Sequence, residues 1–272
     1  MKLPFRPINI VPLRGGFGNQ LFCWAYGRAL AESGHHVFFD RSESLGRGYA
    51  LSGLIPGSSL IELDSRLRRV LMSRVAAAIP GVVVFKERQD AAPLIPTNHG
   101  ALTFHWGYWQ SLEYFYPIAE LLRNELRQWL GAVDPDPEPY CAIHVRRGDY
   151  VTDAGAARTL GALPLDYYER SLHIMKERGL TEFRVYTDDQ RWAVRNVLPL
   201  CDGVSMSASA TALEDFRGII SGSAVILANS SFSWWAAFVG ERENRPIIAP
   251  RKWFSDVRLS DTSITPRGWQ RV

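Results

Sequence analysis

The segment GAVDPDPEPY, residues 131–140, separates two stretches of sequence that each alternate strand-like and helix-like patterns. Pro135, Pro137 and Pro139 alternate here with acidic residues. Because proline fixes φ and lacks a backbone N–H, this segment fits neither a helix interior nor a central strand. We therefore predict a linker, with one domain over residues 1–131 and a second over residues 135–272.

On both sides of the linker, short apolar runs alternate with stretches of helical periodicity. The expected strands cover residues 8–13, 36–40, 82–85, 101–106, 140–145, 183–189, 224–229 and 246–250. The expected helices cover residues 20–33, 60–79, 111–130, 164–178, 190–198, 212–222 and 231–240. This alternation is typical of parallel sheets covered by helices, so we predict an α/β fold with two Rossmann-type domains whose sheets face a cleft.

The composition is that of a soluble enzyme. The 272 residues are 46% hydrophobic and 22% charged, and a net charge of +3 is too weak to indicate a nucleic-acid partner. Cys23, Cys141 and Cys201 lack C-x-x-C spacing, which favours buried thiols in a reducing compartment. The N-terminus has early prolines and no apolar core of a signal peptide, so we expect a cytoplasmic protein.

The uncharged segment 218–240 is long enough to span a membrane. Gly222 and the polar cluster ANSSFS interrupt it, however. We therefore favour a helix, a buried strand and a second helix over a membrane span.

Four polar blocks follow expected strands, where ligands bind in open α/β sheets. The blocks are RGGFGNQ (14–20), HVRRGDY (144–150), YTDD (186–189) and NSSFSWW (229–235). In the first, glycines allow close backbone approach and the next helix offers free N–H groups to an anion. Its spacing matches neither a dinucleotide fingerprint nor a P-loop, so a plain strand-to-helix turn stays equally open.

In the second block, His144 and Arg146 share one strand face and Arg147 takes the other. Guanidinium groups hold phosphates through two parallel hydrogen bonds, and Asp149 can orient them. A surface Arg–Asp pair is the alternative. We favour a role in ligand binding over a surface ion pair, because the whole pattern His-x-Arg-Arg-x-Asp lies at the end of a strand.

The remaining blocks carry acids and hydroxyls. Asp188 and Asp189 suit a metal, a ribose or a helix cap. In NSSFSWW, serines open a helix, so at least one caps it, and the others suit a phosphate. The aromatic residues of FHWGYWQS (104–111) fit either a core or a stacked sugar, and we favour the core.

Taken in order, the four blocks resemble the α-1,2-fucosyltransferases of glycosyltransferase family 11 and, more distantly, the α-1,6- and protein O-fucosyltransferases. The resemblance implies a GT-B-like fold and GDP-β-L-fucose as the donor substrate. It also implies inversion at the anomeric carbon, with neither a metal nor another cofactor. The expected acceptor is a galactose-terminated glycan, fucosylated at O2.

The resemblance also implies roles for residues. Arg146 would hold the β-phosphate of GDP, with Asp149 fixing the arginines or the fucose. His144 and Asp188 would lie near guanine and ribose, and Ser233 with its neighbours would cup the diphosphate. The implied binding set is Gly16, Phe17, Gly18, Asn19, His144, Arg146, Arg147, Asp188, Asp189, Ser231, Phe232 and Ser233.

The general base is not implied by the family. Asp153 is a speculative candidate, and His144, Asp149 or a dissociative path with little need of a base stay open. Acceptor pockets are expected in the loops 40–60, 86–110 and 151–163.

Alternative functions are a fucosyltransferase of another linkage, another GDP-sugar transferase, a lectin-like glycan-binding protein and a metal-dependent transferase using Asp188 and Asp189. The arginines of the helix near residues 66–74 fit peripheral contact with the inner membrane or, more simply, a solvated helix face.

Overall fold

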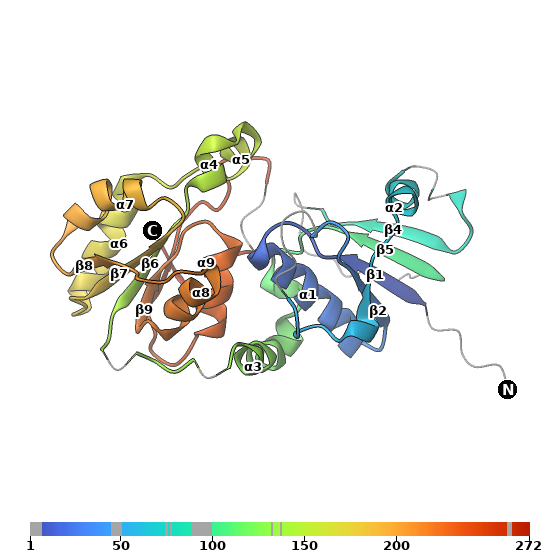
Figure 1. The fold of residues 1–272 in the computed structure, drawn as a ribbon, viewed down its shortest axis with the longest axis horizontal. Coiled ribbons are helices and arrows are strands. Elements are labelled where there is room, and N and C mark those ends of the chain that lie inside the picture. The colour runs from blue at the N-terminus through green and yellow to red at the C-terminus, as the bar shows by residue number, and fades with distance from the viewer. Residues whose placement is uncertain are drawn as a thin grey trace. The chain divides into compact units, whose positions relative to one another are not determined.

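A computed structural model describes residues 7–44, 51–73, 76, 78–88, 100–131, 133–136, 138–259 and 263–272. It contains two parallel β-sheets covered by helices, which confirms the α/β class and the two Rossmann-type sheets (Figure 1). The chain divides into two compact units, Met1–Glu125 and Leu126–Val272. That division falls within helix α3 (Ala119–Leu130), ahead of the proline-rich segment. The assignment of the acceptor to the first domain and of GDP-fucose to the second stays a prediction.

The sheet of the first unit has the strand order β3-β2-β1-β5-β4, and all its paired strands are parallel. Its strands are β1 (Ile8–Pro12), β2 (His36–Asp40), β3 (Leu60–Ile61), β4 (Val82–Lys86) and β5 (Leu102–Trp106). Because β5 lies on the other side of β1 from β2, the strand order reverses between β1 and β5. In sheets of this class, ligands bind outside the carboxyl ends of the strands at such a reversal.

Helices α1 (Phe17–Glu32) and α2 (Ser65–Met72) lie on opposite sides of this sheet (Figure 1). Leu71 of α2 packs with Ile10 and Phe104, whose side chains leave the same sheet face. Most residues of α1 are buried, including the uninterrupted run from Gln20 to Gly27.

The second sheet has the order β11-β10-β9-β6-β7-β8, again parallel throughout. Its strands are β6 (Cys141–Val145), β7 (Phe183–Thr187), β8 (Val204–Met206), β9 (Ala224–Ile226), β10 (Ile247–Ala249) and β11 (Gln270–Arg271). Counted from β6, this is the doubly wound order of a dinucleotide-binding fold. The order reverses between β6 and β9.

Helices cover both faces of the second sheet. Figure 1 shows α6 and α7 on one side and α8 and α9 on the other. Tyr168 and Met175 of α6 and Val197, just after α7, pack against Val185 of β7 in the main core of this unit. The helices are α4 (Gly148–Thr152), α5 (Ala154–Thr159), α6 (Leu165–Glu177), α7 (Gln190–Asn196), α8 (Ala212–Ser221) and α9 (Ser231–Val239).

Two helices predicted from periodicity are shorter in the structure. The expected helix 60–79 begins only at Ser65, because Leu60–Ile61 pairs with β2 and Asp64 accepts hydrogen bonds from the N–H groups of Arg66 and Leu67. The expected helix 111–130 begins at Ala119, after two 3₁₀ turns, the second of which contains Pro117. A proline ring prevents an α-helix from running through this position.

The sequence analysis did not predict α4, α5, β8 or β11. β11 pairs with β10, so the end of the chain completes the second sheet. The uncharged segment 218–240 forms α8, β9 and α9, as predicted. In the parts of the chain that the structure describes, no helix is long and apolar enough to cross a membrane. Cys23 and Cys141 are buried free thiols, whereas the free thiol Cys201 is half-buried.

Candidate functional site

Three of the four polar blocks meet at one edge of the second sheet. β7, β6 and β9 are neighbours, and their carboxyl ends lead into YTDD, HVRRGDY and NSSFSWW. This is the edge at which the strand order reverses, between β6 and β9. The structure therefore brings the predicted residues of the second unit together where this fold class binds ligands.

Arg146 is held between two carboxylates. Its Nη2 donates to Asp149 Oδ1 at 2.7 Å, and its Nη1 lies 2.9 Å from Asp188 Oδ2. The side chain is 35% exposed. Because a guanidinium has five N–H groups in a planar fork, two acids fix its direction and leave other N–H groups for a ligand.

Arg147 is fixed on the other side of the strand end. Its backbone N–H donates to Asp188 Oδ1 at 2.9 Å, and its Nε donates to Asp189 Oδ2 at 3.3 Å. Asp189 also caps α7 by accepting from Trp192 N, which confirms a capping role for one acid of the pair. Gly148 permits this packing, because a Cβ there would lie 2.5 Å from Asp188 Oδ2.

His144, near the end of β6, is buried. Burial, with the positive charge of Arg146, lowers the pKa of His144 to about 3, so its imidazole is neutral at ordinary pH. Its ring lies 5.5 Å from that of Phe232. The buried Nδ1 has no hydrogen-bond partner among the described residues. Such an atom at a strand end suits a ligand that completes its hydrogen bond.

The N-terminus of α9 borders His144. Ser230 is the N-cap and accepts from Phe232 N at 3.4 Å, as predicted for one serine of this block. The Ser233 hydroxyl is buried and donates to carbonyl oxygens of Ala228 and Ser230. Ser231 and Phe232, in the first turn, are only partly buried.

Asn229 opens the block NSSFSWW, but the sequence analysis gave it no role. Its side-chain amide donates to the carbonyl oxygens of Leu160, Gly161 and Trp253, so it ties two loops to the end of β9. Its Oδ1 is buried and has no partner in the described chain. The available signal was an amide side chain directly after a buried strand.

Asp153, the speculative base, has a structural role in this structure. It lies at the N-cap of α5, where its Oδ1 accepts from Ala156 N at 2.8 Å. The residue is exposed. Its catalytic role stays a prediction.

The glycine-rich block forms the turn between β1 and α1 in the first unit. Gly15 adopts φ +69°, and Gly16 is the exposed N-cap of α1. Phe17 and Gly18 begin the helix, and Asn19 Oδ1 accepts from Gln110 Nε2 at 2.7 Å. The predicted approach of this block to the nucleotide stays a prediction.

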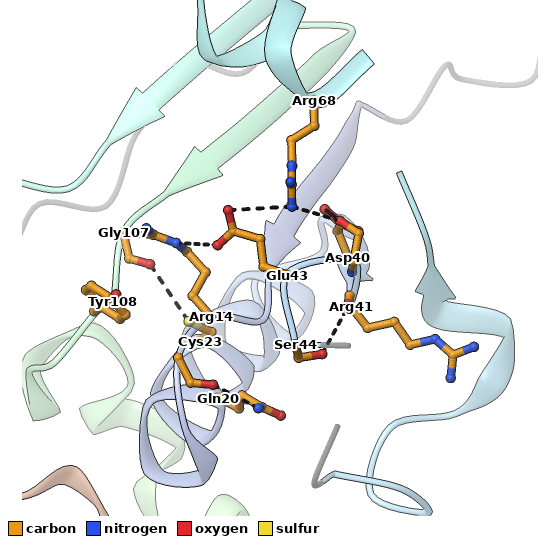
Figure 2. Close-up of polar contacts among 12 residues, drawn as sticks. Arg14, Gln20, Cys23, Asp40, Arg41, Glu43, Ser44, Arg68, Gly107 and Tyr108 are labelled. Atoms are coloured by element: carbon orange, nitrogen blue, oxygen red, sulfur yellow. Dashed lines mark hydrogen bonds and ion pairs between the residues drawn. The ribbon is translucent and has the colours of Figure 1, made fainter. Parts of the chain in front are cut away.

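A second polar cluster, which the sequence analysis missed, lies at the carboxyl edge of the first sheet (Figure 2). Arg14 Nε donates to Glu43 Oε2 at 2.9 Å, and Arg68 Nη1 lies 3.6 Å from Glu43 Oε1. The Arg14 guanidinium carbon lies 3.7 Å from the ring centre of Trp106 and 4.6 Å from that of Tyr108. Arg14 and the aromatic pair belong to segments singled out in the sequence, but the contact between them depends on the strand order.

Glu87 fixes the backbone next to this cluster. Its Oε2 accepts from the backbone N–H groups of Tyr108 and Trp109, at 2.7 and 2.9 Å, and burial raises its pKa. Trp109 is fully buried, adopts φ 57°, and stacks on Tyr26 with 3.9 Å between ring centres. A bulky residue with positive φ is strained, so its neighbours hold this turn in place.

Metal and membrane contacts were also considered in the sequence. Among the described residues, no group of three or more His, Cys, Asp or Glu side chains is placed to hold a metal ion. Metal independence stays a prediction. Of the arginines of α2, Arg68 pairs with Glu43 and Arg66 and Arg69 are exposed. Arg74 and residues 45–50 and 89–99 of the loops 40–60 and 86–110 lie outside the described residues, and membrane contact stays a prediction.

Comparison with known proteins identifies the family. The sequence model described as "Glycosyl transferase family 11" matches residues 94–272. The chain belongs to glycosyl transferase family 11. It is therefore a glycosyltransferase, and the family resemblance predicted from the four blocks is confirmed.

The chain is 28% identical to an "Alpha-1,2-colitosyltransferase" of Escherichia coli, over 97% of this chain and 99% of that one. It is 33% identical to the "O-antigen biosynthesis glycosyltransferase WbnK" of Escherichia coli, over 42% of this chain and 39% of that one. Among solved structures, the fucosyltransferase NodZ from Bradyrhizobium is similar, with 15% identity, a TM-score of 0.44 and coverage of 85% and 92% of the two chains.

Proposed function

We propose that this glycosyltransferase is an inverting, metal-independent α-1,2-fucosyltransferase. It transfers fucose from GDP-β-L-fucose to O2 of a terminal galactose in an oligosaccharide or surface polysaccharide. The observation that carries the proposal is the arrangement of Arg146 at the strand reversal of the second sheet, fixed by Asp149 and Asp188 beside the buried His144.

The second unit supplies groups for a nucleoside diphosphate. When the bond between the fucose C1 and the β-phosphate oxygen breaks, its electron pair goes to that oxygen. The remaining N–H groups of Arg146 stabilise the charge that develops there, and Asp149 keeps the guanidinium aligned. Ser231 and Phe232 offer the start of α9 to the diphosphate.

His144 and the acids bind the nucleoside in this proposal. Neutral His144 completes its Nδ1 hydrogen bond with the guanine or ribose, and Asp188 and Asp189 hold Arg147 beside them. Gly16, Phe17, Gly18 and Asn19, at the start of α1, belong to the proposed donor-binding set, and Ser233 fixes the first turn of α9 through its backbone contacts.

The galactose O2 attacks C1 from the face opposite to GDP, which inverts the anomeric centre. The proton of that hydroxyl passes to a base, for which Asp153 is the proposed group. Because Asp153 also caps α5, its carboxylate would combine both roles. A dissociative path with little need of a base is compatible with the same donor site.

A second candidate is transfer of colitose with the same α-1,2 linkage. The relative that aligns over nearly the full length of both chains is named for that activity. Donor choice separates the two candidates.

The test is calorimetric titration in excess EDTA with GDP-fucose, GDP-colitose, GDP-mannose and UDP-galactose. We expect GDP-fucose to bind most tightly and UDP-galactose not to bind. Tightest binding of GDP-colitose would favour the second candidate, and binding only after Mg²⁺ or Mn²⁺ is added would contradict metal independence. The linkage follows from NMR of the product formed with lactose, where a fucosyl group at any position other than galactose O2 would contradict the proposal.

A further inference from the structure

The carboxyl edge of the first sheet has the features of a second ligand site. Arg14 follows β1 and Tyr108 follows β5, so both stand where the strand order of this sheet reverses. Glu43 follows β2. A parallel α/β sheet binds ligands at this position. At this edge the proposed function uses only the start of α1, and it gives no role to Arg14, Glu43 or Tyr108.

Arg14 is enclosed but uses few of its donors. Its side chain is 17% exposed, and its Nε donates to Glu43. In the described parts of the chain, neither terminal nitrogen of this guanidinium has a hydrogen-bond acceptor. A guanidinium carries five N–H groups, and polar groups that are largely removed from water are normally hydrogen-bonded. The free N–H groups therefore call for a ligand rich in oxygen atoms.

The neighbours of Arg14 indicate the class of ligand. Glu43 offers carboxylate oxygens that accept hydrogen bonds, beside the N–H donors of Arg14. A sugar hydroxyl accepts from Arg14 and donates to Glu43 at the same time, which a deprotonated anion without an O–H group does not do. The half-buried ring of Tyr108 lies beside the guanidinium (Figure 2), and that of Trp106 has its centre 3.7 Å from the guanidinium carbon. Such rings suit the apolar faces of a sugar.

We propose that Arg14, Glu43 and Tyr108 bind a neutral saccharide, and that this saccharide is the acceptor of the transfer reaction. The second half of this statement rests on the proposed function, whereas saccharide binding by the first unit does not. Arg14 and Glu43 bind adjacent hydroxyls of the sugar, and Tyr108 contacts its ring.

The site is held in shape before any ligand binds. Glu87 fixes the backbone of Tyr108 from the buried side. Gly107 allows this contact, because a Cβ there would lie 2.5 Å from Glu87 Cβ. Arg68 lies 3.6 Å from the other oxygen of Glu43. Pre-set groups of this kind lose little conformational entropy on binding, which favours selective recognition.

The test is saturation-transfer NMR and calorimetry with methyl β-D-galactopyranoside and lactose on the full chain. Glu43→Gln keeps the size of the side chain and removes its charge, and Arg14→Ala removes the donors. Because hydrogen bonds to charged groups are the stronger ones, each variant should weaken galactoside binding by about tenfold or more. GDP-fucose affinity should be unchanged in Glu43→Gln.

The matched control is Glu62→Gln. Glu62 pairs with Arg41 at the same sheet but is 48% exposed, so its loss should leave galactoside binding unchanged. Thermal unfolding identifies a variant that fails to fold. If Arg14→Ala does so, Arg14→Lys takes its place, because lysine keeps the positive charge but lacks the paired N–H donors of the guanidinium.

Galactoside binding that survives in Glu43→Gln and Arg14→Lys would overturn the proposal. So would a wild-type chain that binds neither galactoside, or one in which Arg14 binds inorganic phosphate in place of them. If the wild-type chain does not bind GDP-fucose, the proposed function is contradicted. That result would leave the proposal of galactoside binding by Arg14 and Glu43 unaffected.

Discussion

The two sheets each carry an arginine at the point where their strand order reverses, and the partners of these arginines differ. Arg146 lies between two carboxylates and is 35% exposed. Arg14 has one carboxylate, lies against two aromatic rings and is 17% exposed. The more exposed Arg146 is the one that we propose to bind the diphosphate, and the more enclosed Arg14 is the one that we propose to bind a saccharide. The two edges thus differ in the exposure of the arginine and in the groups that surround it.

The largest effect is expected from replacing Arg146 at the carboxyl edge of the second sheet, where we propose that the donor binds and which we call the donor edge. Arg146→Ala should lower the transfer rate by at least about a hundredfold, the scale found when one group that stabilises developing charge is removed. Arg146→Lys should restore little, because a single ammonium replaces a two-pronged fork. Steady-state kinetics measure both, and Arg170→Ala, which removes a 60% exposed arginine of α6, is the control. An active Arg146→Ala variant would remove Arg146 from the mechanism.

The second prediction tests whether the carboxylates beside Arg146 strengthen or weaken the binding of the anionic donor. Asp188 accepts from Arg147 N and pairs with Arg146, so Asp188→Asn keeps an acceptor and removes a charge. We expect GDP-fucose affinity to fall by about tenfold, since one of the two acids that align Arg146 is lost. Calorimetry measures this, with Asp166→Asn of α6 as the exposed control. Tighter binding would mean that the carboxylate competes with the phosphates.

That the residues around Arg146 come together could be predicted from the sequence, because each of their blocks follows a strand directly. To bring His144 and Arg146 close to Asp188, it was enough that β6 and β7 are adjacent in a parallel sheet. Glycosyl transferase family 11 was likewise predictable from the order of the blocks. The cap at Asp153 was missed because the short helices α4 and α5 have no long apolar periodicity to reveal them.

The cluster around Arg14 could not be predicted, because no local pattern contains it. Arg14 meets Tyr108 only because β5 inserts beside β1, and Arg68 meets Glu43 only because the predicted long helix begins late, at Ser65. Sequence periodicity finds strands and helices but does not state the order of strands in a sheet. A site assembled by strand order therefore stays hidden until the fold is known.

The third prediction uses pH to test burial at the donor edge. An unfolded histidine titrates near pH 6.5, whereas burial lowers the pKa of His144 to about 3. Between these values the unfolded chain binds more protons, so the free energy of unfolding should fall as pH drops from 6.5. His144→Gln should reduce that slope, by up to about 1.4 kcal/mol per pH unit below pH 6.

Urea unfolding at pH 5, 6 and 7 measures the slope. His173→Gln is the control, because that side chain is 74% exposed and lies on α6. An unchanged slope in His144→Gln would mean that His144 is accessible to protons in the folded chain.

The smallest effect is expected on the stability of the glycine-rich turn between β1 and α1. Gly15 has φ +69°, and a Cβ there would lie 2.7 Å from Asn19 Nδ2. Gly15→Ala should therefore cost about 1–2 kcal/mol of unfolding free energy and displace the Asn19 amide from Gln110. Gly16→Ser is the matched control, because Gly16 has φ −77°, a Cβ there meets nothing within 4 Å, and serine is a favourable N-cap. Thermal unfolding compares the two variants. If Gly15→Ala loses no stability, the left-handed turn is not required, and the glycines would serve ligand approach alone.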